Sequence, residues 1–292
     1  MDKLKLIAIE RCSNLTKETF QSEYLHKLRP VILQDYSKDW PASKKWNFEY
    51  LKKVAGEMTV PLYADAFANE GVSYLATDKK MRFADYLGLV ERNETKLRMF
   101  LFNIYKKAPQ LCQDFSYPSL VDKYLTKYPF VFFGGKGAHV DVHYDADLSH
   151  LFLTQFCGKR YIVLFHPKYS AYLYRHPFTV STNVNIQAPD FERYSKLKDV
   201  VGYECNLQPG ETLFVPSGYW HYIYYEEGGF SLSLRSPSEN FATRVKGYLN
   251  IMNLVVFDFI VMKILGVSRW VQIKEKLAIA KAEKVSLLDT NS

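Results

Sequence analysis

The sequence has few cysteines, and none of them lie in a pair. In 292 residues there are four Cys, with no CxxC spacing among Cys12, Cys112, Cys157 and Cys205. This spacing excludes a disulfide-stapled scaffold and a zinc module built from cysteines. Such cysteine usage is typical of a reducing compartment, so we expect a cytoplasmic protein.

Long apolar runs are also missing. The strongest candidate, residues 254–267, is interrupted by Asp258 and Lys263. A membrane-spanning helix needs about 20 apolar residues, and a charge at its centre costs about 2.5–3.5 kcal/mol. The first residues contain no apolar run of signal-peptide length. We therefore expect no membrane span, and we find no internal repeat or low-complexity segment.

The sequence lacks a basic stripe, although its formal net charge is +7. Lys and Arg are scattered along the chain, and acidic residues interrupt the densest group near the C-terminus. A nucleic-acid-binding surface usually concentrates its cations on one face. The charge alone therefore indicates a solvated surface, and it favours RNA as a partner only mildly.

Aromatic residues, by contrast, are abundant. They make up 16% of the chain, which favours a β-rich core because rings pack well on pleated sheets. After residue 98 come short apolar runs separated by Gly, Pro, Asn and Asp, without the strand–helix alternation of a parallel sheet. These runs predict antiparallel strands in a sandwich or barrel, at 99–103, 130–133, 150–156, 160–165, 212–215, 219–224 and 230–235.

The flanking segments have a different pattern. Before residue 99 the sequence predicts helices at 16–28, 46–56 and 83–90, with extended segments at 30–33 and 59–63. Residues 166–211 are polar and rich in Tyr, Asn and Pro, which is typical of an insert between strands. After Pro237 the apolar spacing again predicts helix, as far as Lys284.

A cluster of His and Asp residues points to metal chemistry. In His139-Val-Asp141-Val-His143-Tyr-Asp145 the four acidic and imidazole side chains share one parity, so a regular strand would put them on one face. His221 ends the block that begins at Pro209 and is the best third ligand. Two His and one carboxylate leave open coordination positions, as in non-haem Fe(II) oxygenases.

These residues carry a family resemblance. The chain resembles the cupin-like JmjC family of Fe(II)/2-oxoglutarate oxygenases, and within it the asparaginyl hydroxylases of the factor-inhibiting-HIF type. The resemblance covers about residues 6–236 and rests on blocks including Arg29-Pro-Val-Ile-Leu, Asp39-Trp-Pro-Ala, His143-Tyr-Asp145, Gly158-Lys-Arg160-Tyr-Ile-Val-Leu-Phe-His-Pro167 and Pro209–His221.

The resemblance implies a fold and a domain organisation. The expected core is a double-stranded β-helix, or jelly-roll, in a mostly β (α+β) protein with flanking α/β elements at the N-terminus and helices at the C-terminus. Residues 1–236 would form the oxygenase domain, with flanking elements over about 1–98 and the core over about 99–236. Residues 237–292 would form a helical extension, for which the resemblance implies homodimerisation.

The resemblance also implies the ligands. Fe(II) would be held by His143, Asp145 and His221, and 2-oxoglutarate and O₂ would bind to the metal. The pair His139 and Asp141 is a weaker alternative, because the family's Gln follows the first ligand by about ten residues and Gln155 lies closer to that distance from His143.

For the co-substrate, the resemblance points to Arg160, Arg235 and Gln155. Arg160 stands where the asparaginyl hydroxylases have a Lys that binds the distal carboxylate of 2-oxoglutarate, and an arginine fork can do the same. A salt bridge to an internal acid is the competing reading of Arg160, and Tyr161 is a less favoured partner for the anion. Val140 and Phe100 replace hydroxyl groups of the family's pocket.

The leading functional expectation is hydroxylation of a protein or peptide side chain. The segment near Val180 and Ser181 lacks the side chains with which the asparaginyl hydroxylases hold their target, so that substrate does not carry over. Three alternatives remain open: an RNA-directed hydroxylase, a small-molecule hydroxylase, and a metal-binding cupin without oxygenase turnover.

Overall fold

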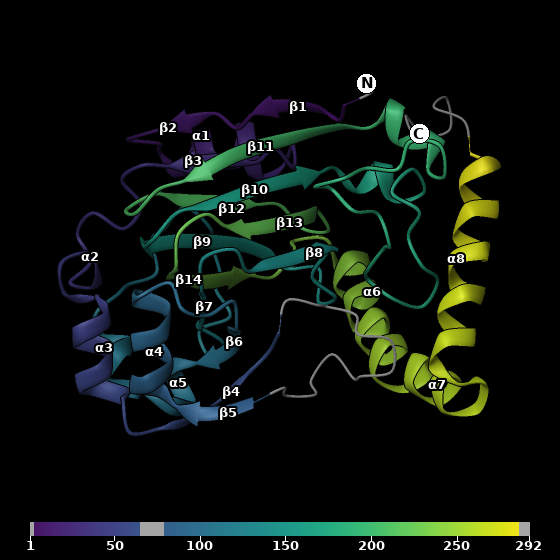
Figure 1. Cartoon of the computed structure of the whole chain (residues 1–292). Helices are drawn as coiled ribbons and strands as arrows, with labels where there is room; N and C mark the ends of the chain where they lie inside the picture. The colour runs from purple at the N-terminus through teal and green to yellow at the C-terminus, as the bar shows by residue number, and fades with distance from the viewer. Residues whose placement is uncertain (1–2, 65–78, 286–292) are drawn as a thin grey trace.

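The computed structural model describes residues 3–64 and 79–285. Residues 286–292, at the end of the predicted C-terminal extension, lie outside the described part. Two β-sheets are stacked at the centre, short helices from the N-terminal half cover one side, and the C-terminal helices stand at the other end (Figure 1). This arrangement confirms the expected mostly β core with flanking helices.

The smaller sheet of the core has five strands. Neighbouring strands are antiparallel except at one edge, where the first strand pairs in parallel with its neighbour. Their order is β1 (Lys5–Ala8), β11 (Val201–Leu207), β10 (Arg160–Phe165), β13 (Trp220–Tyr225) and β8 (His139–His143).

The larger sheet has seven strands. Five of its six strand pairings are antiparallel. The sixth, which involves the edge strand nearest the N-terminus, is parallel. The order is β2 (Arg11–Cys12), β3 (Val31–Leu33), β12 (Thr212–Val215), β9 (His150–Cys157), β14 (Gly229–Ser236), β7 (Phe130–Gly134) and β6 (Arg98–Asn103). All seven strands expected after residue 98 are present, so the antiparallel prediction is confirmed.

The alternation of side chains along these strands builds the interior. On β10, Ile162 and Leu164 pack between the sheets, whereas Val163 and Phe165 face the outer cluster beneath the insert. On β9, Leu151 and Leu153 face inward in the same way. Burial of one apolar face per strand fixes the register, because a slip of one residue would reverse every side chain.

Elements from the N-terminal half cover the outer face of the larger sheet. Phe20, for example, packs its ring against Phe152 and Phe214. Asn47 caps one of the helices by accepting a hydrogen bond from the Tyr50 amide at 2.8 Å. These elements are α1 (Lys17–Phe20), the π-helix η1 (Gln21–Leu25), α2 (Ala42–Lys45), α3 (Phe48–Ala55), β4 (Thr59–Leu62), β5 (Lys79–Arg82), α4 (Phe83–Glu91), α5 (Ile104–Lys107) and the 3₁₀ helix η2 (Pro109–Gln113).

The expectation for residues 166–211 needs correction. The first part is an irregular insert with two 3₁₀ turns, η3 (Pro167–Ser170) and η4 (Ser195–Asp199), but β11 occupies residues 201–207. Its polar residues, such as Glu204 and Asn206, mask its strand character in the sequence. The strand forms because β10 and β1 provide hydrogen-bonding partners on both of its edges.

The C-terminal segment is helical but broken. It comprises α6 (Phe241–Met252), the π-helix η5 (Asn253–Phe257), α7 (Asp258–Leu265) and α8 (Val267–Glu283). Gly266, with a φ of 75°, lets the chain reverse between the last two helices. No helix in the described ranges is long and apolar enough to cross a membrane.

Candidate metal centre

Two histidines face each other at one end of the core. His143 ends β8 and His221 lies near the start of β13, where they are register partners. Their ring centroids are 4.2 Å apart. Asp145 follows His143 by two residues, and the potential ligand atoms of all three side chains lie within 4.8 Å of one another. This distance lets one metal ion contact all three.

A one-residue irregularity in β8 selects which histidine faces inward. His221 pairs with His143, but Ile223 pairs with Val140 and Tyr224 with His139. The shift turns Val140 and His143 toward the cavity between the sheets. The expectation of one shared face for residues 139, 141, 143 and 145 is therefore wrong, because a bulge reverses the alternation.

The structure accordingly separates the two His-x-Asp pairs. His139 lies 3.5 Å from its own neighbour Asp141, and the side chain of Asp141 is 46% exposed. Neither residue belongs to the His143–Asp145–His221 group. The geometry therefore favours the second pair for metal binding.

Backbone carbonyls orient both imidazoles. Nδ1 of His143 lies 2.8 Å from the carbonyl oxygen of Asp141, and Nδ1 of His221 lies 3.2 Å from that of Tyr219. Because a carbonyl only accepts, these contacts assign the proton to Nδ1, so Nε2 is the nitrogen that carries the lone pair a metal would take. Burial, with the neighbouring His221, also lowers the pKa of His143 to about 3, so its ring is neutral.

Asp145 is held by an arginine. Arg235, near the end of β14, places Nη1 2.8 Å from one Asp145 oxygen and 3.2 Å from Asp147, and it also donates to Ser149. Burial alone would raise the pKa of Asp145, but the charge and hydrogen bond of Arg235, together with the neighbouring His221 and His143, outweigh burial and hold that pKa below its usual value. The carboxylate is therefore ionised, with its second oxygen available to a metal.

The three residues open into an internal cavity of about 270 Å³. Its wall is largely apolar and includes Leu151, Leu153 and Ile223. The charged and imidazole side chains that line it are His143, Asp145, His221, Arg98, Arg160 and Arg235. Such a chamber, apolar with a few placed charges, is typical of a small-molecule site.

Arg160 is the most deeply buried of these arginines. It is 1% exposed and donates to the Ser231 hydroxyl at 2.6 Å and to the Phe132 carbonyl at 2.8 Å. Its guanidinium also stacks 4.3 Å from the centre of the Tyr225 ring. No carboxylate in the described part of the chain pairs with it, so the competing reading of an internal salt bridge finds no partner there.

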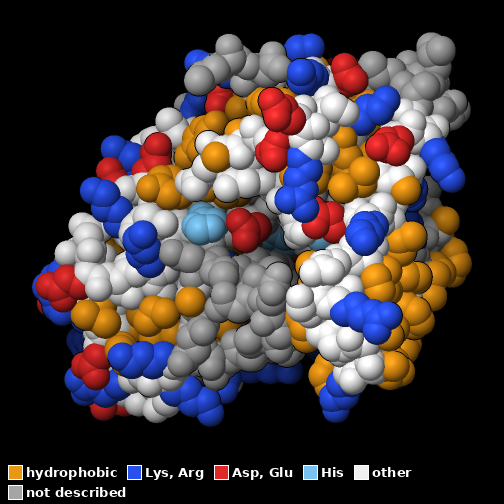
Figure 2. Space-filling model, turned by 45° about the vertical axis from the view of Figure 1, so that its right-hand side comes forward, with side chains coloured by type: hydrophobic (Ala, Val, Ile, Leu, Met, Phe, Trp, Pro, Cys, Tyr) orange, Lys and Arg blue, Asp and Glu red, His pale blue; other side chains and the backbone are white. Residues whose placement is uncertain are grey.

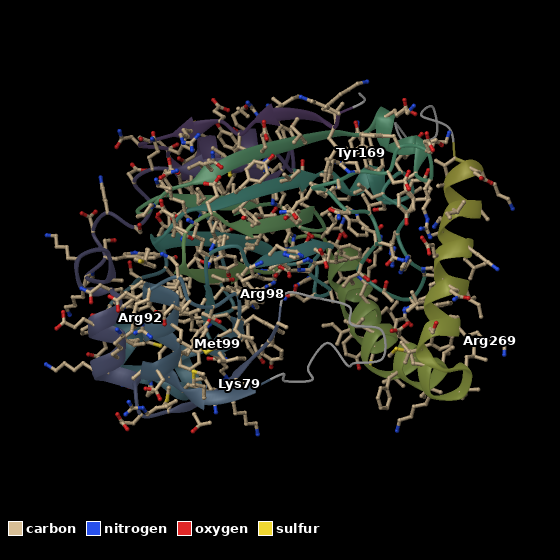
Figure 3. The ribbon with its side chains drawn as sticks, in the orientation of Figure 1. Lys79, Arg92, Arg98, Met99, Tyr169 and Arg269 are labelled. Atoms are coloured by element: carbon tan, nitrogen blue, oxygen red, sulfur yellow. The ribbon has the colours of Figure 1, made fainter. Side chains whose placement is uncertain are left out.

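Arg98 is a cavity residue that the sequence analysis missed. It begins β6, is 4% exposed and lines the same cavity (Figure 3). Its Nη2 donates to the Ala64 carbonyl at 3.2 Å. The only sequence signal was a charged residue directly before the apolar run at 99–103, and charged residues at strand ends are common.

The other expected pocket residues are divided between two locations. Val140 and Phe100 line the cavity, as expected. Tyr161 faces the other side of β10 and donates its hydroxyl to Glu204 at 2.5 Å. Gln155 is buried on β9, and its amide donates to the backbone carbonyls of Cys157 and Gly158, which ties it to the β9–β10 turn.

The segment expected on the substrate side does lie beside the centre. Ser181 forms an isolated bridge with His143, and the Tyr144 amide donates to the Val180 carbonyl at 3.0 Å. Val180 also lines the cavity. The residues of this segment beside the centre are therefore the apolar Val180 and the small, polar Ser181.

Comparison of the sequence with known proteins identifies its family. The model of the cupin-like domain matches residues 17–244. Similar curated proteins include a lysine-specific demethylase 8 of Xenopus tropicalis, 27% identical over 74% of this chain and 50% of its own length. The lysine-specific demethylase JMJ21 of Arabidopsis thaliana is 30% identical over 74% of this chain and 24% of its own.

A third relative matches over most of both chains. The human tRNA wybutosine-synthesizing protein 5 is 26% identical over 80% of this chain and 80% of its own length. The chain spans about half the length, or less, of the demethylase relatives. The family match over most of the core, together with the jelly-roll sheets, shows that the chain belongs to the cupin-like JmjC-domain family of Fe(II)/2-oxoglutarate oxygenases.

Proposed function

We propose that the chain is an Fe(II)- and 2-oxoglutarate-dependent hydroxylase, with His143, Asp145 and His221 as the metal ligands. The observation that carries this proposal is the grouping of the three ligand atoms within 4.8 Å in a cavity that also contains a buried cation, Arg160, to which the described residues offer no acidic partner. Two neutral imidazoles and one carboxylate suit Fe(II) and leave coordination positions open.

The residues fit the co-substrate as well. Arg160 would bind the distal carboxylate of 2-oxoglutarate, because burial lowers the pKa of its guanidinium and an incoming anion would offset that cost. Leu164 pairs with His221, so Arg160 starts four residues, about 13 Å, along the strand from the metal end. A long side chain reaching back from that position leaves room for a short dicarboxylate between the two.

Each protein group has a defined task in the reaction. Bound Fe(II), 2-oxoglutarate and O₂ would together convert a substrate C–H to C–OH, with release of succinate and CO₂. Arg235 fixes one oxygen of Asp145, and the two carbonyls fix the imidazoles. Leu151, Leu153 and Ile223 keep water from the space in which the C–H bond must be oriented.

For the substrate, we propose a protein side chain first. The names of the demethylase relatives support a protein target. RNA is the second candidate, and one observation favours it: the wybutosine-synthesizing relative matches over about four-fifths of both chains, whereas the demethylases match over half of their length or less.

We also propose that two chains pair through the C-terminal helices and that the protein works in the cytoplasm. All four cysteines are free, which supports a reducing compartment. The exposed apolar residues of α6 and α7, described in the Discussion, support pairing.

The experiment that tests the activity is conversion of 2-oxoglutarate to succinate by the full chain with Fe(II) and ascorbate. We expect iron-dependent succinate formation that is lost in His221→Ala. Absence of succinate from a chain that binds Fe(II) would instead identify a metal-binding cupin without turnover. A mass search for products heavier by one oxygen, in lysates with active or His221→Ala protein, then distinguishes protein from RNA targets.

A further inference from the structure

A second pocket lies next to the metal cavity. Its volume is about 440 Å³, and Tyr144 is a wall of both spaces. Tyr144 stands between His143 and Asp145 in the chain, so the Tyr144 side chain would separate a ligand in the second pocket from the metal centre. A chamber of this size is in the range of nucleotide and cofactor sites.

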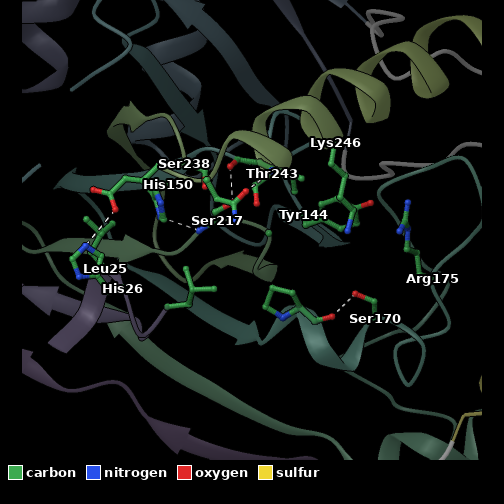
Figure 4. Close-up of a pocket in the computed structure, with 16 residues that line it drawn as sticks. Leu25, His26, Tyr144, His150, Ser170, Arg175, Ser217, Ser238, Thr243 and Lys246 are labelled. Atoms are coloured by element: carbon green, nitrogen blue, oxygen red, sulfur yellow. Dashed lines mark hydrogen bonds and ion pairs between the residues drawn. The ribbon is translucent and has the colours of Figure 1, made fainter. Parts of the chain in front are cut away.

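One end of this pocket is cationic. Figure 4 shows Arg175 and Lys246 at the same end as Tyr144, with Leu25 and His26 at the opposite end. The Arg175 guanidinium lies 5.3 Å from the centre of the Tyr144 ring, and its Nε donates to the Thr179 carbonyl. Within the described ranges neither Arg175 nor Lys246 forms an ion pair.

The one carboxylate lining the pocket does not neutralise these cations. Glu239 lies at the end marked by His26, and its carboxylate pairs with the His26 ring at 3.3 Å. The cationic end therefore keeps an excess of positive charge. Two cations from different segments, converging on one space, are the usual arrangement for binding an oxyanion.

Two hydroxyl-bearing residues accompany the cations. The Tyr144 hydroxyl is buried and has no hydrogen-bond partner, although such a group normally has one. Thr243 precedes Lys246 by about one turn of α6 and also lines the pocket. An oxyanion between Arg175 and Lys246 would provide acceptors for hydroxyl donors of this kind.

The position of Lys246 is fixed by the packing of α6. The next residue, Gly247, has no side chain and lets α6 lie directly on the backbone of Asp147. Asn250 donates its amide to the Ala146 carbonyl at 3.3 Å. The face of α6 that carries Gly247 and Asn250 is therefore held against the loop that follows Asp145, and Lys246 lies beside that face.

The rest of the pocket is larger than a phosphate requires. Toward the His26 end its wall contains Leu25, Leu28 and Pro167, which offer apolar surface to a ring. We propose that this pocket binds a nucleotide unit, with its phosphate between Arg175 and Lys246 and its ribose and base along the apolar wall. The inference rests on the second candidate of the proposed function, an RNA target, and deepens it, because it places one nucleotide of that target next to the proposed metal centre.

The test is binding of adenosine monophosphate to the full chain in EDTA, measured by calorimetry, with adenosine and inorganic phosphate as separate probes. We expect adenosine monophosphate to bind more tightly than either probe. Lys246→Met should weaken its affinity about tenfold or more, through loss of one charge-assisted contact, and leave adenosine unaffected. Arg244→Met, two residues away on the exposed side of the same helix, is the matched control and should bind normally.

Other outcomes would overturn the proposal. These are no binding of adenosine monophosphate, binding no tighter than inorganic phosphate, equal affinities in Lys246→Met and the native chain, or tighter binding of a phosphoserine peptide. Because the measurement uses neither metal nor 2-oxoglutarate, its failure leaves the oxygenase proposal standing. Conversely, a chain that forms no succinate can still bind the nucleotide.

Discussion

At the scale of single residues, the arginines at the two ends of the cavity have different partners. Arg235 is neutralised by Asp145 and Asp147 at the metal end, whereas Arg160 at the other end has only neutral hydrogen-bond partners among the described residues. A buried charge of this kind costs several kcal/mol unless an anion joins it. In the proposed function, Arg160 would therefore mark the end of the cavity that receives the free carboxylate of 2-oxoglutarate.

This assignment predicts a specific kinetic change. Arg160→Met should raise the 2-oxoglutarate concentration needed for half-maximal succinate formation by about 10- to 100-fold, because a charge-assisted hydrogen bond contributes about 1.5–3 kcal/mol. Fe(II) affinity should stay near normal. Lys159→Met, at the neighbouring and more exposed position, is the control. An unchanged 2-oxoglutarate requirement in Arg160→Met would mean that the anion is bound elsewhere.

His150 makes folding stability depend on pH. It is 3% exposed, burial lowers its pKa to about 4, and its Nδ1 accepts a hydrogen bond from the Ser217 amide at 3.1 Å. The folded-state pKa lies below the unfolded value of about 6.5, so this contribution is complete above pH 6.5 and is lost as the pH falls toward 4. Protonation of Nδ1 removes the acceptor.

We therefore predict that the free energy of unfolding falls by at most about 3 kcal/mol from this residue between pH 6.5 and 4. Urea denaturation in EDTA at several pH values measures it. His150→Phe should be less stable at pH 7 and should depend less on pH over that interval. The exposed His26→Gln variant should keep the native slope; equal slopes in native protein and His150→Phe would refute the assignment.

At the scale of elements, the sequence predicts the strands well where one face is apolar. Arg160, Ile162 and Leu164 share the inner face of β10, as their alternation indicates. It does not reveal β11, because the polar residues of that strand are compensated by two neighbouring strands. Nor does it reveal the bulge of β8, since a bulge depends on pairing with β13 rather than on local sequence.

The sequence names the three residues that the structure brings together, but not the structural reason that favours His143 over His139. The two histidines have equivalent parity, and the spacing to Gln155 favours His143 only through the family resemblance, whereas the register with His221 turns His143 toward the cavity. Arg98 was unpredictable for a similar reason: its cavity position follows from the pairing of β6 with β7. Long-range pairing, which a single sequence does not display, decided both.

The contact of α6 with residues 146–147, in the loop after Asp145, predicts the effect of a substitution at Gly247. A Cβ on Gly247 would overlap the Asp147 carbonyl, so Gly247→Ala should push α6 away although alanine favours helix. We expect a loss of about 1–3 kcal/mol, seen as a melting temperature lower by several degrees. Lys276→Ala, at an exposed position of α8, should leave it unchanged. A Gly247→Ala protein as stable as native would show that α6 does not rest on this loop.

At the scale of the whole molecule, the C-terminal helices expose much apolar surface. Phe241 is 71% exposed, Tyr248 64%, Leu249 54% and Ile264 74%. Figure 2 shows hydrophobic side chains gathered along the lower right flank. Contiguous apolar patches of this kind on monomers are rare and usually mark an interface. The proposed pairing of two chains would cover this surface, because the inner face of α6 already packs on the loop after Asp145 and its outer face is exposed.

We predict a dimer in solution. Light scattering after size exclusion should give twice the chain mass for the full-length protein. A version ending near Ser238 should be monomeric. Leu249→Arg places a charge in the patch without removing α6 and should also give a monomer, whereas Lys276→Met on α8 should remain dimeric. A monomeric full-length protein would contradict the proposal.

The central claim is that His143, Asp145 and His221 hold Fe(II) for chelation by 2-oxoglutarate. Its most direct test is the visible charge-transfer absorption that a 2-oxo acid gives when it chelates Fe(II), recorded without O₂ on the full chain. We expect this band in the native protein and in His139→Ala, and its loss in His143→Ala. No band in the native protein, or a band that survives in His143→Ala and disappears in His139→Ala, would show that these three residues do not hold the metal.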